Sequence, residues 1–245
     1  MVDGSPESAS GFDPTALLGA LSGIAAPEAT TEVMAAELGG SFDRIEAGAA
    51  IIRAGERSQS LIIVIAGWAF RHKDFSDSRR QILALLLPGD CCGRDASRTP
   101  DHSVSALTAV TLVKIPHSRL AEVVARHAEI AAALAQAAVV EAAILRAWVA
   151  NLGQRQARER MAHLFCELGL RTRTRGLAAD GNSFRLPLTQ QDLASVLGLT
   201  SVHVNRVLQR LRAEGLIGLR GGVVTVNDHD RLCALAGFDP AYLTP

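Results

Sequence analysis

The amino-acid sequence predicts an α+β fold, in which a β-rich amino-terminal half precedes a long helix and a mostly helical carboxy-terminal half. Three stretches of the 245 residues carry this prediction. Residues 45–115 hold short apolar runs between turn residues, residues 118–152 lack glycine and proline, and residues 187–226 alternate short helical patterns with glycine. Strands and helices segregated in this way are typical of the α+β class.

The β-rich prediction rests on four runs of β-branched and apolar residues. They are Ala50–Ile52, Leu61–Ile65, Ile82–Leu87 and Leu112–Ile115. Glycine, aspartate, serine and proline separate the runs, and many short strands with a turn signal between each pair indicate a β-sandwich or a barrel. We therefore expect a β domain over residues 41–116. A flexible polar tail and a short helix are expected before it, over residues 1–40.

A long helix is predicted from Ser118 to Leu152, because alanine, the best helix former, dominates this stretch. Its larger side chains recur about every 3.5 residues, which is the coiled-coil period. At ~1.5 Å per residue the helix is about 50 Å long, and it outreaches a small β domain. We expect a second copy of the helix to cover the rest of its stripe over residues 117–151, and packing wholly within one chain is the alternative. The predicted seam comprises Leu120, Ile130, Leu134, Ala138, Leu145 and Trp148, with His127 and Glu141 in the same stripe.

The long helix is expected to end at a hinge, because Asn151-Leu152-Gly153 interrupts the pattern. A last domain is predicted over residues 152–245. It begins with a helix from Gln154 to about Leu170, since apolar residues recur there on one face. The polar, glycine-containing stretch from Thr172 to Asn182 is expected to be a loop.

Residues 187–226 predict a helix-turn-helix followed by a small hairpin. Thr189 is a good N-cap, with Asp192 in the first turn, and Gly198 ends this short helix. Thr200 is a second N-cap candidate, and it starts a helix that runs to about Glu214. Two short helices joined by a tight glycine turn form the helix-turn-helix arrangement. The stretch Leu219–Val226 then forms two strands around Gly-Gly, which is the wing of a winged helix-turn-helix.

The outward face of the second helix has the chemistry of base recognition. In this arrangement its first residues face the base edges in the major groove, where arginine pairs with guanine and asparagine with adenine. A solvated face usually mixes glutamate with lysine, whereas this one carries three arginines and, at its far end, one acid. The predicted DNA contacts are Ser201, Val202, His203, Asn205, Arg206 and Arg210, with Thr189, Gln191 and the wing residue Arg220 on phosphates.

The charge distribution agrees with a nucleic-acid partner. The net charge of the chain is zero, but Leu152–Pro245 carries 12 arginines, no lysine and 8 acids, a net of +4. The first 151 residues carry 13 basic and 17 acidic residues, a net of −4. We therefore expect the carboxy-terminal part to meet a polyanion such as double-stranded DNA.

At these residues the sequence resembles the Crp/Fnr family of bacterial transcription regulators, to which cyclic-AMP receptors belong. The resemblance covers nearly the whole chain from about Ser41. It is strongest over Leu188–Ala194, Gly198–Leu208 and Glu214–Ile217. It implies an amino-terminal β-roll of the cyclic-nucleotide-binding type, a long dimerisation helix and a carboxy-terminal winged helix-turn-helix. It also implies a homodimer, with RNA polymerase and a small-molecule effector as candidate further partners.

Carried over by position, the family's base-reading arginine falls on Arg206 and its earlier base-reading positions on Ser201 and Val202. Many members have an acid where Val202 stands, and a valine cannot accept a hydrogen bond from cytosine. The resemblance therefore implies an operator unlike that of the best-known members, with His203 and Asn205 taking part in its recognition.

The resemblance implies a divergent effector pocket, formed by Gly93, Arg94, Ser103, Leu145 and Arg146. The family's Gly-Glu-Leu pattern is replaced by Gly93-Arg94-Asp95, and its phosphate-binding arginine by the stretch Asp101 to Ser103. The polar pair on the dimer helix aligns with Leu145 and Arg146. An acid near a phosphate repels it, so cyclic AMP is disfavoured, while Arg94 remains a candidate anion ligand.

No cofactor and no metal site are predicted. The four cysteines form no Cys-x-x-Cys pair, and none precedes Cys91, whereas iron–sulfur clusters need several thiolates. Haem needs an axial ligand, which His72, His102, His117 or Cys91 could offer, but none of these lies in a recognisable haem motif. Cys91-Cys92 would be a redox switch if Arg94 stabilised a thiolate. Two buried apolar residues beside a turn are the favoured interpretation, and His127 is likewise interpreted as packed.

A cytoplasmic, non-membrane protein is expected, because the apolar patch Leu17–Ala26 is too short to span a bilayer and we expect no other run of spanning length. No phosphate-binding glycine loop, nucleophile elbow or zinc-ligand spacing occurs, so no enzyme class is supported. The leading interpretation is a DNA-binding regulator of unknown signal. The alternative is a cyclic-nucleotide or other small-ligand module that acts through protein partners.

Overall fold

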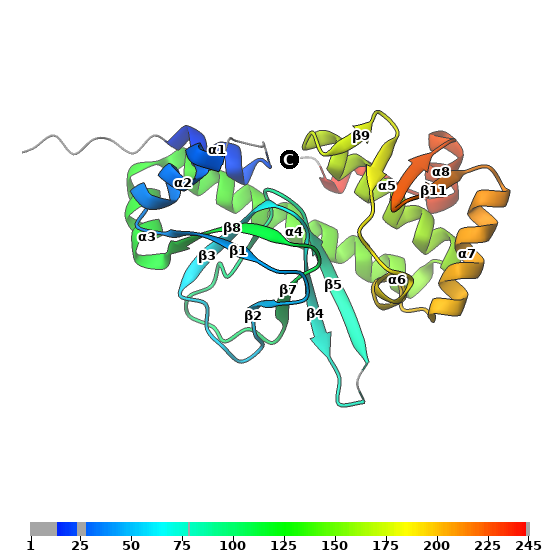
Figure 1. Cartoon of the computed structure of the whole chain (residues 1–245), viewed down its shortest axis with the longest axis horizontal. Coiled ribbons are helices and arrows are strands. Elements are labelled where there is room, and N and C mark those ends of the chain that lie inside the picture. The colour runs from blue at the N-terminus through cyan, green and yellow to red at the C-terminus, as the bar shows by residue number, and fades with distance from the viewer. Residues whose placement is uncertain (1–13, 24–27, 78, 244–245) are drawn as a thin grey trace, which may run out of the picture.

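The computed structural model describes residues 14–23, 28–77 and 79–243, so the expected tail from Met1 to Asp13 lies outside the described residues. Two lobes are joined by one long helix, α4 (Figure 1). The amino-terminal lobe contains α1 (Pro14–Leu21), α2 (Glu28–Glu37), β1 (Ser41–Ile45), β2 (Ala50–Ile52), β3 (Ser60–Ala66), β4 (Ala69–Asp74), β5 (Arg80–Leu86), β6 (Cys91–Cys92), β7 (Ser103–Ala106), β8 (Val110–Pro116) and α3 (His117–Arg126). It is followed by α4 (Ala128–Gln154), α5 (Ala157–Thr174), β9 (Ala178–Asp180), β10 (Ser183–Arg185), α6 (Gln190–Leu197), α7 (Ser201–Ala213), β11 (Ile217–Arg220), β12 (Val223–Val226), α8 (His229–Ala236) and the 3-10 turn η1 (Pro240–Leu243).

The β domain is a roll of two antiparallel sheets, in the orders β1-β8-β3-β6 and β2-β7-β4-β5. The four predicted runs are confirmed as β2, β3, β5 and β8. The strands that the sequence did not reveal are short or polar. β6 has two residues, and the outer half of β4 is the exposed Lys73-Asp74 of a projecting hairpin. Residues without apolar alternation become strands here because neighbouring strands pair with them.

The helix expected to be continuous from Ser118 to Leu152 is in fact two helices, which is a correction. The chain breaks at His127, whose φ of −125° and ψ of 87° lie outside the helical region. Val123 before the break and Ile130 after it are both buried in the same core against the β-roll. The break lets α3 lie across the roll while α4 leaves toward the other lobe, so tertiary packing overrides a sequence without helix breakers.

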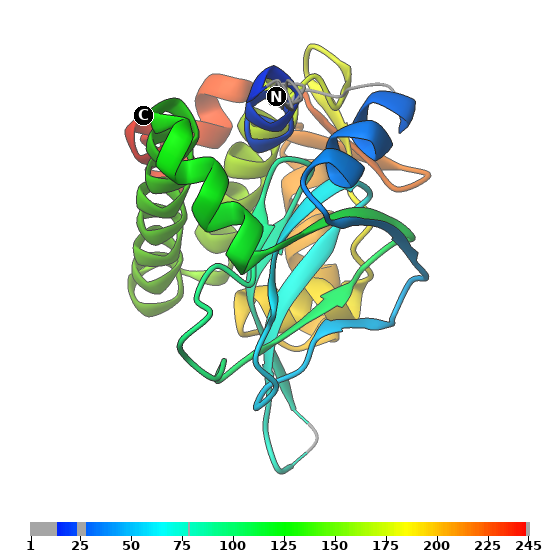
Figure 2. The same ribbon diagram turned by 90° about the vertical axis from the view of Figure 1, so that its left-hand side faces the viewer.

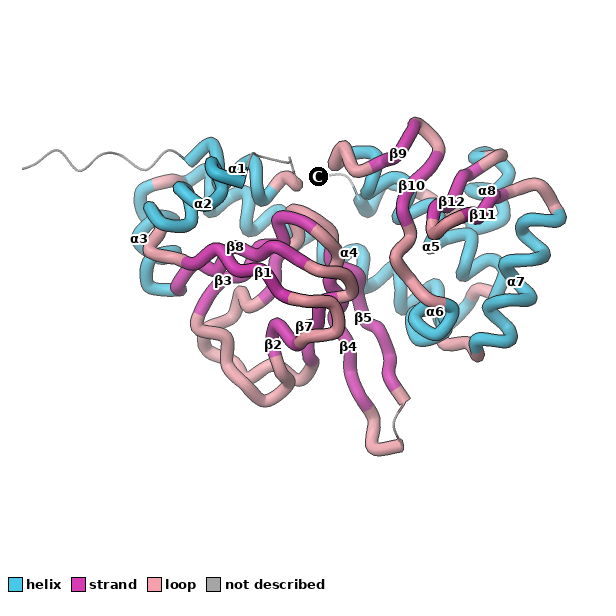
Figure 3. Tube along the Cα trace, in the orientation of Figure 1, coloured by secondary structure: helices cyan, strands magenta, loops and turns pink. Residues whose placement is uncertain are grey.

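The hinge expected at Asn151-Leu152-Gly153 is also displaced. α4 continues through Gly153 and ends at Arg155, and α5 starts after Gln156, whose side chain forms a capping box with Glu159. The expected loop from Thr172 to Asn182 holds the end of α5, strand β9 and the turn that leads into β10, so part of it belongs to the hairpin β9–β10. That hairpin extends the wing into one sheet, β11-β12-β10-β9 (Figure 3).

The carboxy-terminal lobe shares one apolar core with the β4–β5 side of the roll, including Phe70, Leu85 and Phe165. A polar clamp reinforces this contact. Asp90 accepts hydrogen bonds from Arg171 at 2.5 Å and Arg175 at 2.7 Å, and the attraction of these two cations lowers the pKa of Asp90 to about 2 against the opposing effect of burial. The two lobes therefore form one packed unit.

Candidate DNA-binding surface and effector pocket

The helix-turn-helix is built by the capping residues that the sequence predicted. The Thr189 hydroxyl accepts a hydrogen bond from the Asp192 backbone N–H at 3.1 Å, and the Asp192 carboxylate accepts from the Thr189 N–H at 2.9 Å. Gly198 ends α6 at a φ of 62°, where a side chain would be strained. The Thr200 hydroxyl then caps α7 by accepting from the His203 N–H. The side chains predicted to face inward are all buried: Leu193, Val196, Leu197, Val204, Val207, Leu208 and Leu211.

The first half of α7 presents an open polar face. Val202, His203, Asn205 and Arg206 are exposed, and Ser201 is half-buried. Among the described residues no hydrogen bond or ion pair is found for the side chains of Asn205 and Arg206, so their donors are available to a partner. Val202 is 69% exposed. An unpaired arginine beside an exposed apolar residue suits a base edge and a thymine methyl group.

The second half of α7 differs, because its charge is already paired. The Glu214 carboxylate accepts hydrogen bonds from Arg210 at 3.0 Å and from Arg158 of α5 at 2.7 Å. These contacts hold the pKa of Glu214 below its ordinary value. Arg210 remains exposed, but Glu214 offsets much of its charge, whereas Arg206 has no acidic partner among the described residues and Arg212 donates only to the neutral Gln209 amide at 3.4 Å.

The wing is a tight hairpin. Gly221 and Gly222 both have positive φ, 57° and 75°, as a two-residue turn of the primed type requires. Arg220 lies just before the turn and is exposed. Thr189 and Gln191 are exposed at the start of α6, although the Thr189 hydroxyl is already held by the Asp192 carboxylate at 2.6 Å.

The β-roll contains a cavity of about 480 Å³ between its strands and α4. Of the predicted effector residues, Gly93 and Arg94 line it. Gly93 cannot be replaced there, because a Cβ would stand 2.6 Å from the Ser60 carbonyl oxygen. Asp101 lies at the same cavity, and hydrogen bonds from His102 and Lys73 hold its pKa at about 2, so a negative charge stands there as expected.

The most informative residue of this pocket is one that the sequence assigned to the helix seam. Glu141 of α4 accepts hydrogen bonds from Arg71 of β4 through one carboxylate oxygen and from Arg94 through the other. The three side chains are 28%, 12% and 24% exposed, respectively, so this bridge is largely shielded from water. Arg71 and Arg94 are 23 residues apart in the chain, and only folding brings them together. A hint in the sequence is that Glu141 is the sole acid from Ile130 to Ala150.

The remaining effector residues are dispersed. Leu145 lines a second cavity of about 350 Å³, which shares Arg71, Arg94 and Glu141 with the first. The Ser103 hydroxyl accepts a hydrogen bond from the Ala54 backbone N–H and lines neither cavity. Arg146 is exposed on the outer face of α4. The bridge around Glu141 thus separates two cavities, and Ser103 and Arg146 stand outside both.

The predicted helix seam is corrected at two positions. Ile130 is fully buried in its own chain, and Trp148 is 6% exposed and donates through Nε1 to Glu167 at 2.9 Å. Leu120, Leu134 and Leu145 are partly buried against their own lobe, and Ala138 is exposed. The stripe that faces outward instead comprises the exposed Ala132, Ala135, Val139, Arg146 and Val149, with half-buried Ala142 among them. In Figure 2 the green helices run along one border of the molecule, with the sheets of the β-roll beside them.

The outer face of α4 is apolar as well as long. The helix has a mean hydropathy of 1.7 over an 18-residue window, of which 11% is buried. By length and composition alone it would qualify as a membrane span, which corrects the expectation that the chain has no run of that length. Exposed Val139 and Val149, at 59% and 73%, lie ten residues apart on this face.

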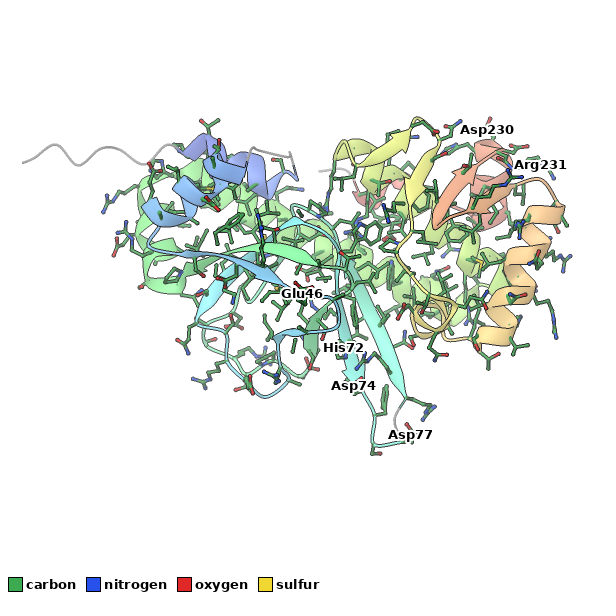
Figure 4. The ribbon with its side chains drawn as sticks, in the orientation of Figure 1. Glu46, His72, Asp74, Asp77, Asp230 and Arg231 are labelled. Carbon is green, nitrogen blue, oxygen red and sulfur yellow. The ribbon has the colours of Figure 1, made fainter. Side chains whose placement is uncertain are left out.

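Three of the cysteine and histidine candidates in the β-roll, Cys91, Cys92 and His72, are buried within the fold. Cys91 and Cys92 point to opposite sides of their sheet into two different cores, and burial raises their pKa values to about 11 and about 12. This supports packed thiols over a redox switch at that pair. Figure 4 shows His72 on β4, near the projecting hairpin. Its Nε2 lies 3.0 Å from the Ser105 hydroxyl, and burial lowers its pKa, which favours a neutral packed ring.

Comparison with known proteins places these features in context. Residues 159–235 match a family model described as a Crp-like helix-turn-helix domain, and residues 42–127 match one described as a cyclic nucleotide-binding domain. The chain is 31% identical over 197 residues to the transcriptional activator protein FnrL of Cereibacter sphaeroides, which covers 79% of both chains. It is also 31% identical over 196 residues to the transcriptional activator protein Anr of Pseudomonas protegens, again 79% of both.

Solved structures show the same architecture. FixK2 from Bradyrhizobium japonicum superposes with a TM-score of 0.72 at 25% identity, over 80% of this chain and 96% of that one. CooA from Carboxydothermus hydrogenoformans gives a TM-score of 0.67 at 15% identity, over 80% and 88%, and supports the fold alone.

Proposed function

The chain belongs to the Crp/Fnr family of transcriptional regulators, and we propose that it acts as a homodimer whose two α7 helices read a two-fold symmetric DNA site. The observation that carries this proposal is the first half of α7, where Asn205 and Arg206 are exposed and unpaired among the described residues. In the family's docking mode these residues face base edges, while Thr189, Gln191 and Arg220 lie where phosphates pass.

Dimerisation supports the proposal through the outward stripe of α4. Ala132, Ala135, Val139, Ala142, Arg146 and Val149 follow one another at alternating spacings of three and four residues, which is the heptad pattern of a coiled coil. Small alanines allow two helices to approach closely. A second copy would remove Val139 and Val149 from water, and the docking mode of helix-turn-helix dimers requires the two α7 helices to lie about 34 Å apart, one turn of DNA.

We further infer that the β-roll senses a small anion. Arg71 and Arg94 already hold one carboxylate, that of Glu141, so their geometry suits an anionic group of a ligand. A ligand that displaced Glu141 would free a residue of α4 itself, and α4 carries the proposed seam. Charged Asp101 at the same cavity disfavours a cyclic phosphate as that ligand.

This function needs access to the chromosome, so the protein is proposed to be cytoplasmic. Regulation of transcription then requires the DNA-bound dimer to recruit or exclude RNA polymerase, which makes that enzyme its proposed protein partner.

The proposal is tested by selecting the sequences that the protein binds from a pool of random duplexes. The affinity of the protein for the selected duplex is then measured over a range of salt concentrations. We expect a two-fold symmetric site and an affinity that falls steeply with salt, because phosphate contacts release counterions. If no duplex is retained at low salt, the DNA-binding proposal is wrong. The alternative, a ligand module that acts on proteins, would then be favoured.

A further inference from the structure

The carboxy-terminal lobe holds a pair of thiols that DNA recognition does not use. Cys166 lies on α5 and Cys233 on α8, and their sulfur atoms are 3.6 Å apart. Cys166 is buried, Cys233 is half-buried, and both are free thiols. A disulfide has an S–S length of about 2.05 Å, so closing this gap needs a movement of about 1.5 Å. The two helices already pack directly against each other.

Two further features make the pair accessible to a small oxidant. His229, one turn before Cys233 on α8, places its Nε2 atom 3.6 Å from the Cys233 sulfur, and its ring is 51% exposed. Cys233 is reached from the surface, because it is half-buried, while Cys166 and His229 line a hollow of about 20 Å³ between α5, α8 and the wing sheet. That is room for one water-sized molecule. A base, a thiol and a small cavity thus meet at one place.

We propose that Cys166 and Cys233 form a reversible disulfide on reaction with hydrogen peroxide or another hydroperoxide, and that this bond lowers the affinity of the helix-turn-helix for DNA. Cys233 is the thiol that reacts first, because it is the more exposed and has the imidazole beside it. Cys166 is the resolving thiol, and burial raises its pKa, which keeps it protonated until an electrophilic sulfur is adjacent.

The reaction balances with the peroxide as the sole oxidant. His229 takes the Cys233 proton as the sulfur attacks one peroxide oxygen, the O–O bond breaks, and the leaving hydroxide recovers that proton as water. Cys233 is then a sulfenic acid. The Cys166 sulfur attacks the Cys233 sulfur, the S–S bond forms and the S–O bond breaks. The departing hydroxide takes the Cys166 proton, so two thiols and one peroxide give one disulfide and two waters.

The disulfide is coupled to the DNA surface through the start of α8. The Asn227 backbone N–H donates to the Leu216 carbonyl at 3.0 Å, which ties the segment before α8 to the turn between α7 and β11. Moving α8 toward α5 therefore displaces the turn that fixes the position of the wing relative to α7. Arg206 and Arg220 lie on those two elements, so their joint fit to one duplex is disturbed.

The test is oxidation of the full-length chain, followed by thiol counting and peptide mapping under denaturing conditions. Of the four cysteines, we expect two free thiols after peroxide treatment, a Cys166–Cys233 cross-linked peptide, and return to four with dithiothreitol. Cys91 and Cys92 serve as internal controls, because their burial predicts that they stay reduced. Four unchanged thiols, or a cross-link that joins two chains, would overturn the proposal.

The variants separate the steps. Cys166→Ala should stop at a Cys233 sulfenic acid that dimedone traps. Cys233→Ser should keep its three thiols, and His229→Gln should form the same disulfide several-fold more slowly.

Oxidised wild type should bind the selected duplex about tenfold more weakly than the reduced form, equal to ~1.4 kcal/mol. Oxidised Cys166→Ala should match its own reduced form. A disulfide that leaves DNA affinity unchanged would refute the proposed control of binding. Since thiol counting needs no DNA, failure of the disulfide and failure of DNA binding are distinguishable.

Discussion

Single residues decide what this surface reads. The sequence allowed the face of α7 to be predicted because its determinants are local: two threonine caps and one glycine fix where each helix starts, and helical periodicity then fixes which side chains point outward. The Arg71–Glu141–Arg94 bridge could not be predicted in this way. Its members come from a strand, from the loop after β6 and from a distant helix, and no local pattern pairs them.

Replacing Arg206 with alanine should weaken binding to the selected site by about 1–3 kcal/mol and to random duplex by much less. The reason is that a base contact adds to specific binding alone. Arg53→Ala is a suitable control, because it removes an exposed arginine from the β-roll. Fluorescence anisotropy on both duplexes measures the difference, and equal losses on the two would reduce Arg206 to a phosphate contact.

Replacing Glu141 with glutamine should leave two partly buried arginines without an anion, which lowers the thermal midpoint by several degrees. Added sulfate should then raise that midpoint more in the variant than in wild type, because the vacated arginines bind it. Chloride at equal ionic strength separates binding from screening. Glu129→Gln, on the same helix and half-exposed, is the matched variant. Identical sulfate responses in all three proteins would argue against an anion site.

At the scale of elements, α4 shows what periodicity can and cannot establish. The alanine-rich stretch was correctly identified as helical, but alanine fits a buried stripe and an exposed one equally well. The larger residues Ile130 and Trp148 marked the stripe that faces the chain's own lobes. Three of the six residues in the outward stripe are alanine, and exposure in the folded chain was needed to distinguish it. The break at His127 has no signal in the sequence for a related reason, since it arises from packing against the β-roll.

Introducing glutamate at Val139 should weaken the dimer, because two-fold symmetry brings the new charges near each other at the seam. We expect a rise of at least tenfold in the dimer dissociation constant, about 1.4 kcal/mol, by sedimentation at several concentrations. Val33→Glu is a close control, because Val33 on α2 is 58% exposed against 59% for Val139. Sedimentation showing equally strong dimers in both variants would move the interface away from this stripe.

The whole molecule depends on the junction between its lobes, where Asp90 holds Arg171 and Arg175. Nearby, buried Glu167 accepts from Trp148 and Tyr242, which ties α4 and η1 to the same junction. Glu167, Arg171 and Arg175 follow one another along α5, but Asp90, Trp148 and Tyr242 are distant from them in sequence, so the junction depends on tertiary structure. The general order of β domain, long helix and helix-turn-helix was nevertheless evident from composition.

The Asp90 clamp predicts a pH dependence of stability. Its folded pKa of about 2 lies below the ordinary 3.8, so its contribution is fully present above pH 4 and is lost as the pH falls toward 2. Asp90→Asn should therefore lower the free energy of unfolding by roughly 2 kcal/mol at neutral pH, and the gap to wild type should close between pH 4 and 2. Glu32→Gln, an exposed charge loss on α2, should show no such convergence in denaturant titrations.

The first helix of the DNA-binding motif does not stand free of the β-roll. α6 packs against β5, and the Gln81 side-chain amide donates to the Val196 carbonyl at 3.4 Å. Each helix-turn-helix is thereby held against the β-roll of its own subunit and does not move independently of it. Two helix-turn-helix units fixed in this way meet a duplex at one separation. The number of base pairs between the half-sites should therefore affect the DNA affinity of this regulator as strongly as the base sequence of the half-sites does.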